Sequence, residues 1–307
     1  MALPPLFKNL RLPVVGAPMF IVSGPELVIA QCKAGIVGSM PALNARPSAQ
    51  FDEWLGRIRD ELSAWDRANP DKPAAPYAVN LIVHGTNARL DEDLDIVAKH
   101  KAPIVITSLG ARDDVNGRVH AYGGFVFHDV TTTPFARKAI DKGADGLVLV
   151  AAGAGGHAGR VSPFALVEET RAWFDGPIAL SGAIASGRGI RAAQAMGADL
   201  AYIGSAFITA KEADATREYK DTIIEAVAGD IVYTDFFSGI PGNYLRQTIE
   251  RHGYDPANLP KREEGVHVTD GVKAWRDIWA AGQGVGAVRA VESVDVMIER
   301  WRTEMSR

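Results

Sequence analysis

The sequence predicts an α/β protein of the (β/α)₈ class, a TIM barrel, with a mainly helical insertion after the eighth strand. Short apolar runs alternate eight times with amphipathic segments before residue 210, which is the pattern of repeated βα units. Several runs also lack polar alternation, as expected for parallel strands that are covered on both faces. The 307 residues are enough for a barrel of about 250 residues together with an insertion.

The eight expected strands are short and rich in β-branched residues. They are Pro13–Met19, Ile36–Met40, Tyr77–Val83, Ile104–Leu109, Phe125–Val130, Gly146–Ala151, Ile178–Ser181 and Leu200–Ile203. The sixth contains Leu147–Val150, which is wholly apolar and therefore indicates burial on both faces of a sheet. Parallel strands need crossover connections, and we expect helices such as Pro134–Lys142 and Arg188–Met196 to supply them.

A weak repeat marks the helix ends. Gly143–Asp145 precedes the sixth strand, Gly197–Asp199 precedes the eighth, and Ala34-Gly35 precedes the second. Each glycine lies where a left-handed helix cap would turn the chain into the next strand. An open doubly wound sheet is the alternative, but its edge strands would more often be amphipathic, so the pattern favours the closed barrel.

The chain changes character after Ile208. Residues 209–271 carry many charges and an aromatic, glycine-rich stretch, and we expect them to form a helical lid or substrate subdomain. The barrel would then comprise residues 1–208 and 272–307, with a final helix at Ser293–Thr303. Four aromatic residues of the insertion could form pocket walls or a small core of their own: Tyr233, Phe236, Phe237 and Tyr244.

Composition limits the classes of function. Hydrophobic residues make up 47% and charged residues 23% of a chain with net charge −4, and no basic run suggests a nucleic-acid partner. No apolar stretch has the length of a membrane span. The single cysteine, Cys32, excludes an intramolecular disulfide, and the histidines lack metal-binding spacing. We therefore expect a soluble cytoplasmic protein without a metal site.

Two glycine-containing loops follow the seventh and eighth strands. They are Ser181–Gly187 and Gly204–Ala206. Barrels often bind phosphate in these two positions, because glycine lets backbone N–H groups approach the anion. Glycine is common in any βα turn, but the pair of loops favours a phosphate-bearing ligand.

The densest glycine stretch, Gly153–Gly159, follows the sixth strand and contains His157. Its backbone could lie against a flat ligand while the imidazole moves a proton near neutral pH. A surface histidine without a task is the simpler alternative. The stretch also fits a G-x-G-x-x-A dinucleotide fingerprint, but that motif belongs to the first βα turn of its fold, so we disfavour it.

Other polar and soft side chains are expected at the strand ends. Gly16–Met19 ends the first strand and offers Met19 as one wall for an aromatic ring. Asn80 and Ser108, in the third and fourth strands, could hydrogen-bond a heterocycle or cap turns. His128-Asp129 ends the fifth strand and could reach the site or form a packing pair.

Together these segments resemble the nitronate monooxygenase family, formerly called 2-nitropropane dioxygenases, which are FMN-dependent barrel enzymes. The resemblance spans nearly the whole chain. It is carried by Gly16–Met19, Ala154–Gly159, Ser181–Ile184, Gly187–Gly189, Met196–Asp199, Tyr202–Phe207 and Trp279–Gly286.

The resemblance implies that His157 abstracts a proton α to a nitro group. It implies that FMN is held through its phosphate by Gly182 and Gly204-Ser205, with residues 17–19 and Asn80 around the ring. The full expected cofactor set is Ala17, Pro18, Met19, Asn80, Ser108, Gly155, Gly156, Ser181, Gly182, Ala183, Gly204 and Ser205. The substrates would be a nitronate or nitroalkane and dioxygen, and the products a carbonyl compound and nitrite.

The same superfamily contains a second activity, the FMN-dependent NAD(P)H reductases of quinones or of enoyl-acyl carrier protein. The related enoyl reductases carry an acidic residue where this chain has Gly153, which disfavours that reaction but not quinone reduction. A flavin-binding sensor without catalysis would leave His157 and the lid without a purpose. The sequence does not decide the oligomeric state, and a homodimer is the assembly considered.

Overall fold

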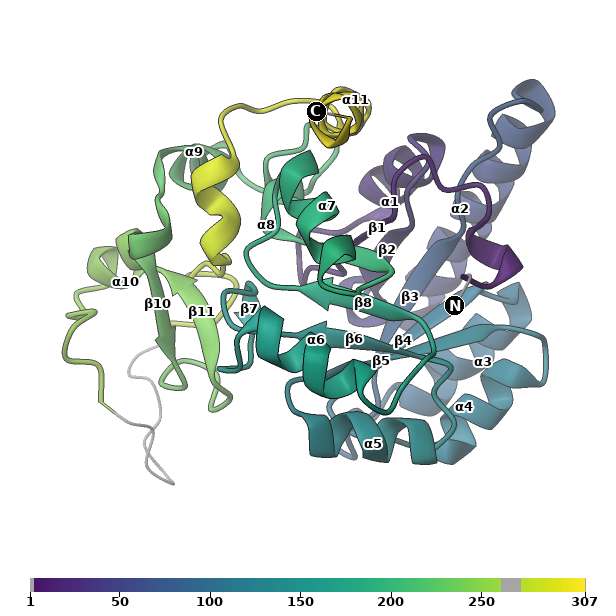
Figure 1. Ribbon diagram of the computed structural model, residues 1–307, viewed down its shortest axis with the longest axis horizontal. Helices are drawn as coiled ribbons and strands as arrows, with labels where there is room; N and C mark the ends of the chain where they lie inside the picture. Colours follow the sequence, from purple (N-terminus) through teal and green to yellow (C-terminus); the bar gives the residue numbers. More distant parts are fainter. Residues whose placement is uncertain (1–2, 261–271, 307) are drawn as a thin grey trace.

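The computed structural model describes residues 3–260 and 272–306, and its centre is an eight-stranded parallel sheet that closes into a barrel (Figure 1). Neighbouring strands follow in the order β1 (Val14–Gly16), β9 (Leu200–Ile203), β8 (Ile178–Ser181), β6 (Gly146–Val150), β5 (Phe125–Val130), β4 (Ile104–Ser108), β3 (Tyr77–Ile82) and β2 (Gly38–Pro41). The two ends of the sheet meet where the Val37 N–H donates to the Val14 carbonyl at 3.0 Å and the Gly16 N–H donates to the Val37 carbonyl at 2.8 Å. The predicted (β/α)₈ barrel is confirmed.

Helices surround the barrel and connect its strands. They are α1 (Pro25–Lys33), α2 (Ser48–Ala68), α3 (Leu90–His100), α4 (Asp113–His120), α5 (Thr133–Asp141), α6 (Pro163–Arg171), α7 (Gly187–Ala195), the short α8 (Ser205–Ile208) and the final α11 (Val294–Met305). Gly35, Gly143 and Gly197 have φ values of 86°, 88° and 105°, so each adopts the left-handed conformation expected of a helix cap.

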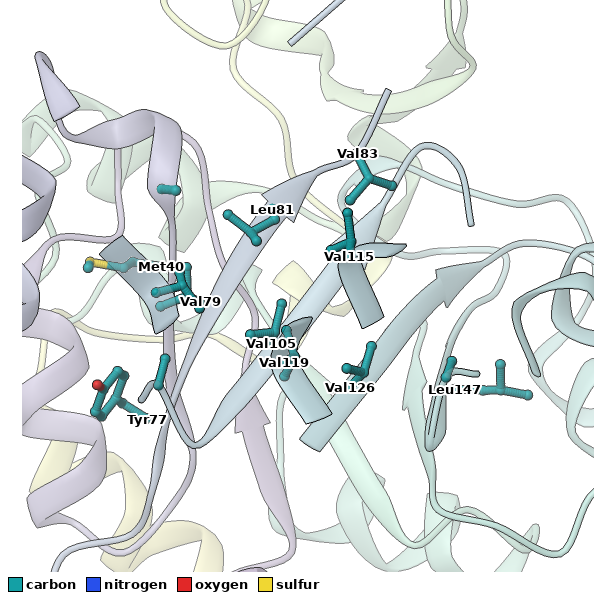
Figure 2. Close-up of a cluster of buried hydrophobic side chains, with 14 of the residues drawn as sticks. Met40, Tyr77, Val79, Leu81, Val83, Val105, Val115, Val119, Val126 and Leu147 are labelled. Carbon is teal, nitrogen blue, oxygen red and sulfur yellow. The ribbon is translucent and has the colours of Figure 1, made fainter. Parts of the chain in front are cut away.

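The strands bury both of their faces, which explains their continuous hydrophobicity. Val79, Val105 and Val126 point outward and pack under the helices, beside Val115 and Val119 of α4 (Figure 2). The residues between them in the strands, such as Ala78 and Ile104, point into the barrel.

Aromatic rings fill the end of the barrel at which the strands begin. Phe7, on the 3₁₀ helix η1 (Pro5–Phe7), packs on Phe125 and Phe127 with ring centroids 5.6 and 6.0 Å away. Phe125 and Phe127 are themselves 5.0 Å apart. Because this end is filled, open space for a ligand remains at the carboxyl ends of the strands.

The insertion contains two helices, α9 (Arg217–Glu225) and α10 (Arg246–Arg251), and the 3₁₀ turn η3 (Ala228–Asp230). It also contains an antiparallel hairpin, β10 (Ile231–Thr234) and β11 (Gly242–Leu245), which the sequence did not predict. β11 pairs in turn with β7 (Gly156–His157), the two-residue strand of the glycine-rich loop. The hairpin lies at one side of the barrel, next to β7 (Figure 1). The boundary predicted at residue 271 lies outside the described residues.

After the insertion the chain returns to the barrel through the 3₁₀ helix η4 (Gln283–Ala287) and α11. α11 packs on α7, where the Glu304 carboxylate accepts a hydrogen bond of 2.7 Å from the Gly187 N–H. A Cβ at Gly187 would lie 2.1 Å from the Trp301 carbonyl oxygen, so only glycine permits this approach. The final helix therefore completes the barrel wall, close to the predicted bounds. No helix in residues 3–260 or 272–306 combines the length and hydrophobicity that crossing a membrane requires.

The aromatic filling of the barrel can be tested with two phenylalanine substitutions. Phe127→Ala should lower the free energy of unfolding by about 3 to 5 kcal/mol, because Phe127 is 1% exposed and the change leaves a cavity. Phe164→Ala is the matched control, with an expected effect within about 0.5 kcal/mol, because Phe164 is 69% exposed. Urea unfolding of both variants gives the comparison, and equal losses would contradict the described packing.

Candidate active site

A cavity of about 1230 Å³ opens at the carboxyl ends of the barrel strands. We call it the central cavity. Strand ends supply its floor, with Asn80 of β3, Ser108 of β4, Asp129 of β5, Ser181 of β8 and Tyr202 of β9. A single small ligand commonly occupies about 300 to 1000 Å³, so this cavity has room for more than one bound molecule.

Most of the side chains and glycines that the sequence singled out line this cavity. They are Ala17, Pro18, Met19, Asn80, Ser108, Gly155, Gly156, His157, Ser181, Gly204 and Ser205. Gly182 and Ala183, which were expected among them, do not line it. Gly182 has a φ of 146°, and a Cβ there would lie 2.8 Å from the Ala152 carbonyl oxygen, so the close approach of two loops explains this glycine. The Ala183 N–H donates to the Gly153 carbonyl at 3.2 Å.

The two predicted phosphate loops present unused backbone donors. The N–H groups of Gly182 and Gly204 donate to no acceptor in the part of the chain that the structure describes. Ser205 begins α8, and its hydroxyl oxygen accepts a hydrogen bond of 2.8 Å from the Gly282 N–H. A ligand phosphate could accept from such donors.

Gly282 belongs to Trp279–Gly286, a segment noted in the sequence only for its family resemblance and given no role in the site. A Cβ on Gly155 would lie 2.8 Å from the Gly282 nitrogen, and a Cβ on Gly282 would lie 2.5 Å from the Gly153 carbonyl oxygen. The Gln283 N–H also donates to the Gly153 carbonyl at 2.9 Å. The glycines at 155 and 282 thus let two distant segments pack backbone against backbone.

His157 lies on the cavity wall as part of β7. Its Nε2 atom is buried and has no hydrogen-bond partner among the described residues. The imidazole packs edge to face on Trp275, with ring centroids 5.1 Å apart and an interplanar angle of 79°. Burial lowers the pKa of His157, which favours the neutral imidazole, the form that can accept a proton.

The insertion holds the loop that carries His157. β11 pairs with β7 in the register His157↔Gly242, and the Asn243 side-chain amide donates to the Ala154 carbonyl at 2.6 Å. The Tyr233 hydroxyl donates to the Ala158 carbonyl at 3.0 Å. These bonds fix a segment that its glycines would otherwise leave flexible.

A hydrogen-bonded chain of three polar side chains crosses the cavity floor. The Asn80 amide donates to the Ser108 hydroxyl at 2.7 Å, and the Ser108 hydroxyl donates to the Asp129 carboxylate at 2.6 Å. The second oxygen of Asp129, Oδ1, is buried without a partner among the described residues, and burial raises the pKa of Asp129 to about 7. A carboxyl group that is partly protonated at neutral pH therefore faces the cavity.

The sequence recognised Asp129 only as half of a pair with His128. Both residues line the cavity, but their neighbours differ. His128 Nδ1 lies 2.6 Å from the Thr107 hydroxyl, and burial lowers the pKa of His128 to about 4. The sequence analysis expected this pair to reach the site or to pack, but it gave Asp129 no role, because no sequence signal shows that Ser108 would bind it.

The aromatic residues of the insertion divide between the two predicted roles. Phe236, Phe237 and Tyr244 pack together with Tyr254 into a small core. Tyr233 lines the central cavity, as does Trp275, which the sequence analysis did not select.

The dinucleotide fingerprint does not have its required surroundings. In that motif a helix begins within the glycine-rich turn, whereas here the turn leads into β7 and the next helix begins at Pro163. Within residues 3–260 and 272–306, no group of three or more His, Cys, Asp or Glu side chains is placed to hold a metal ion.

The chain is similar to proteins of one enzyme family along most of its length. Residues 60–301 match the family model for nitronate monooxygenase. A nitronate monooxygenase of Pseudomonas aeruginosa is 26% identical over 350 residues, which cover 94% of this chain and 95% of that protein. A Mycobacterium tuberculosis monooxygenase is 33% identical over 155 residues, half of this chain, but the matched region spans only 41% of its length.

Solved structures share the fold. Nitroalkane oxidase from Streptomyces ansochromogenes has a TM-score of 0.81 at 23% identity, with 99% of this chain and 98% of that one covered. FabK from Thermotoga maritima has a TM-score of 0.79 at 25% identity, with 98% and 94% covered. At this level of identity the likeness to the nitroalkane oxidase shows the fold alone.

The buried carboxyl group of Asp129 should make stability depend on pH. A folded pKa of about 7 against about 3.9 in the unfolded chain means that its stabilising contribution is full below pH 4 and is lost as the pH rises through 7. The Asp129→Asn side chain stays neutral. The free energy of unfolding of this variant, measured relative to that of the unsubstituted protein, should therefore rise by about 2 to 3 kcal/mol when the pH is raised from about 5 to about 8. Urea unfolding at both pH values measures this gain.

Asp141→Asn provides the control, because Asp141 is exposed and the substitution removes the same charge. A stability difference between Asp129→Asn and the unsubstituted protein that stays constant with pH would show that Asp129 is ionised throughout.

Proposed function

The chain belongs to the nitronate monooxygenase family, and on that premise we propose that it is an FMN-dependent enzyme that oxidises alkyl nitronates with dioxygen to a carbonyl compound and nitrite. Nitroalkanes would enter the reaction after deprotonation. The observation that carries the proposal is the unpartnered Nε2 atom of a neutral His157 on the wall of the central cavity.

Several features of the cavity suit FMN. The Gly204 N–H, on the cavity wall at the start of α8, is an unused donor for a phosphate. Met19 offers a polarizable side chain to one face of a ring, and Asn80 and Ser108 offer polar atoms to its edge. When bound, FMN supplies a two-electron acceptor that dioxygen can reoxidise.

The proposed role of His157 follows from its surroundings. The electron-withdrawing nitro group makes the neighbouring C–H bond acidic enough for an imidazole base. The C–H electron pair stays on the substrate, which becomes the nitronate, while the proton passes to Nε2. Trp275 restricts the ring, and the pairing of β7 with β11 fixes the backbone that carries it.

The size of the cavity favours a second candidate, an FMN-dependent NAD(P)H reductase of quinones or of enoyl-acyl carrier protein. A volume of about 1230 Å³ leaves space beside a flavin for a nicotinamide or a large acceptor. In that reaction His157 would give a proton to the reduced substrate instead of removing one.

Cofactor and reaction can be tested in one anaerobic experiment. The purified protein, saturated with FMN where necessary, should be yellow and should release FMN on denaturation. Addition of an alkyl nitronate without oxygen should bleach the flavin absorbance, because the nitronate is the electron donor, whereas NADH should not. Bleaching by NADH alone would establish the reductase, and a protein that binds no FMN would exclude both candidates.

The role of His157 can be separated from simple substrate binding. His157→Asn should lower kcat/KM for a neutral nitroalkane by about 100-fold or more, since only that substrate needs a base, and should change the value for the preformed nitronate far less. Steady-state oxygen consumption measures both. His84→Asn is the control, because His84 lies on the cavity wall but is exposed and is 2.9 Å from Thr86. Equal losses on the two substrates would make His157 a binding residue.

A further inference from the structure

The charged side chains on the wall of the central cavity are unevenly placed. They are Asp129, Lys138 and Arg160. Asp129 lies on the floor with one oxygen buried, whereas Lys138 and Arg160 are both exposed and therefore lie toward the mouth. The whole chain has a net charge of −4, yet among the described residues the exposed charged side chains that line the cavity are these two cations. A field of this sign attracts an anion.

These two cations have no carboxylate partner in residues 3–260 and 272–306. Arg160 lies over the ring of Tyr233, 5.0 Å from its centroid, and no ion pair joins it or Lys138 to an acid. Other basic residues of the same region are engaged. Lys142 pairs with Asp113 at 3.4 Å, and Arg137 lies over Trp173. Lys138 and Arg160, which line the cavity, can therefore form an ion pair with a ligand.

A carboxylate near the start of α5 accepts a side-chain hydrogen bond. The Thr133 hydroxyl donates to the Glu169 carboxylate at 2.8 Å, and Glu169 does not line the cavity. It therefore does not neutralise the mouth from within.

Large apolar side chains are exposed around the same opening. Phe20, Leu109, Phe135 and Ile240 are 36 to 59% exposed, and all four line the cavity. Phe135 and Lys138 are three residues apart on α5, so they share one face of that helix. Exposed apolar surface beside a cavity indicates a ligand that covers it.

Arg160, at the mouth of the cavity, lies close to the proposed catalytic base in the sequence. Arg160 follows His157 by three residues, and an extended chain spans about 10 Å over that interval. One molecule of moderate length can therefore reach His157 with its reacting carbon and Arg160 with its other end. The volume of the cavity leaves room for such a molecule beside FMN.

We propose that Lys138 and Arg160 bind an anionic group at the far end of an elongated substrate, whose apolar body lies against Phe135 and its apolar neighbours at the mouth. This inference rests on the proposed function and narrows its substrate class to amphipathic anions. The anion is a carboxylate or a phosphate, since both accept hydrogen bonds from these cations. A short neutral nitroalkane would use only the inner part of the cavity.

Calorimetric titration of the FMN-loaded protein with decanoate, decyl phosphate and decanol tests the inference without turnover. The three probes share one alkyl chain and differ in charge. At least one of the two anions should bind about tenfold more tightly than decanol. The affinity for this anion should decrease when the salt concentration is raised from about 0.05 M to about 0.5 M. The stronger of the two anions identifies the head group.

Substitutions test whether Lys138 and Arg160 cause the tighter binding of the anionic probe. The double substitution Lys138→Gln with Arg160→Gln should abolish the preference for the anion and leave decanol binding unchanged. Arg137→Gln is the matched control on α5, because Arg137 stacks on Trp173 and does not line the cavity. Equal binding of all three probes, or an anion preference that survives the double substitution, would overturn the inference.

This result is separable from the test of function. Intact anion preference with no flavin bleaching by nitronates would refute the proposed reaction and keep the anion site. Flavin bleaching without anion preference would do the reverse.

Discussion

The candidate site depends on the pairing of two short strands that are far apart in the sequence. β7 contains Gly156 and His157 in a loop of four glycines, and on its own such a segment has many accessible conformations. β11 pairs with it, and the Asn243 amide binds the Ala154 carbonyl on the same loop. The insertion therefore restricts the backbone that carries the proposed base, in addition to lining part of the cavity.

The barrel could be predicted from the sequence because its signals are local. The strands at 125–130, 178–181 and 200–203 have the predicted bounds, and Gly35, Gly143 and Gly197 adopt the predicted left-handed conformation. A barrel also places every strand end around one opening. For this reason residues as distant as Met19, Asn80 and Ser205 could be assigned to a common site before their contacts were known.

The parts that could not be predicted depend on contacts between distant residues. Gly242 and Asn243 have weak strand propensity, and β11 exists because β7 and β10 lie on either side of it. Asp129 acquires its raised pKa from burial beside Ser108, which no spacing reveals. The sequence predicts Gly182 for the phosphate site and does not show that the loop after β6 fills the position of its side chain, which gives this glycine a steric cause as well.

The proposed function requires FMN to lie between the glycine turns and His157. The most direct measurement is a crystal structure of the protein with FMN bound. It should show the phosphate at the N–H of Gly204 and the start of α8, with the ring system between Met19 and His157. A phosphate bound elsewhere, or a ring that His157 does not face, would refute the proposed site even if the barrel were unchanged.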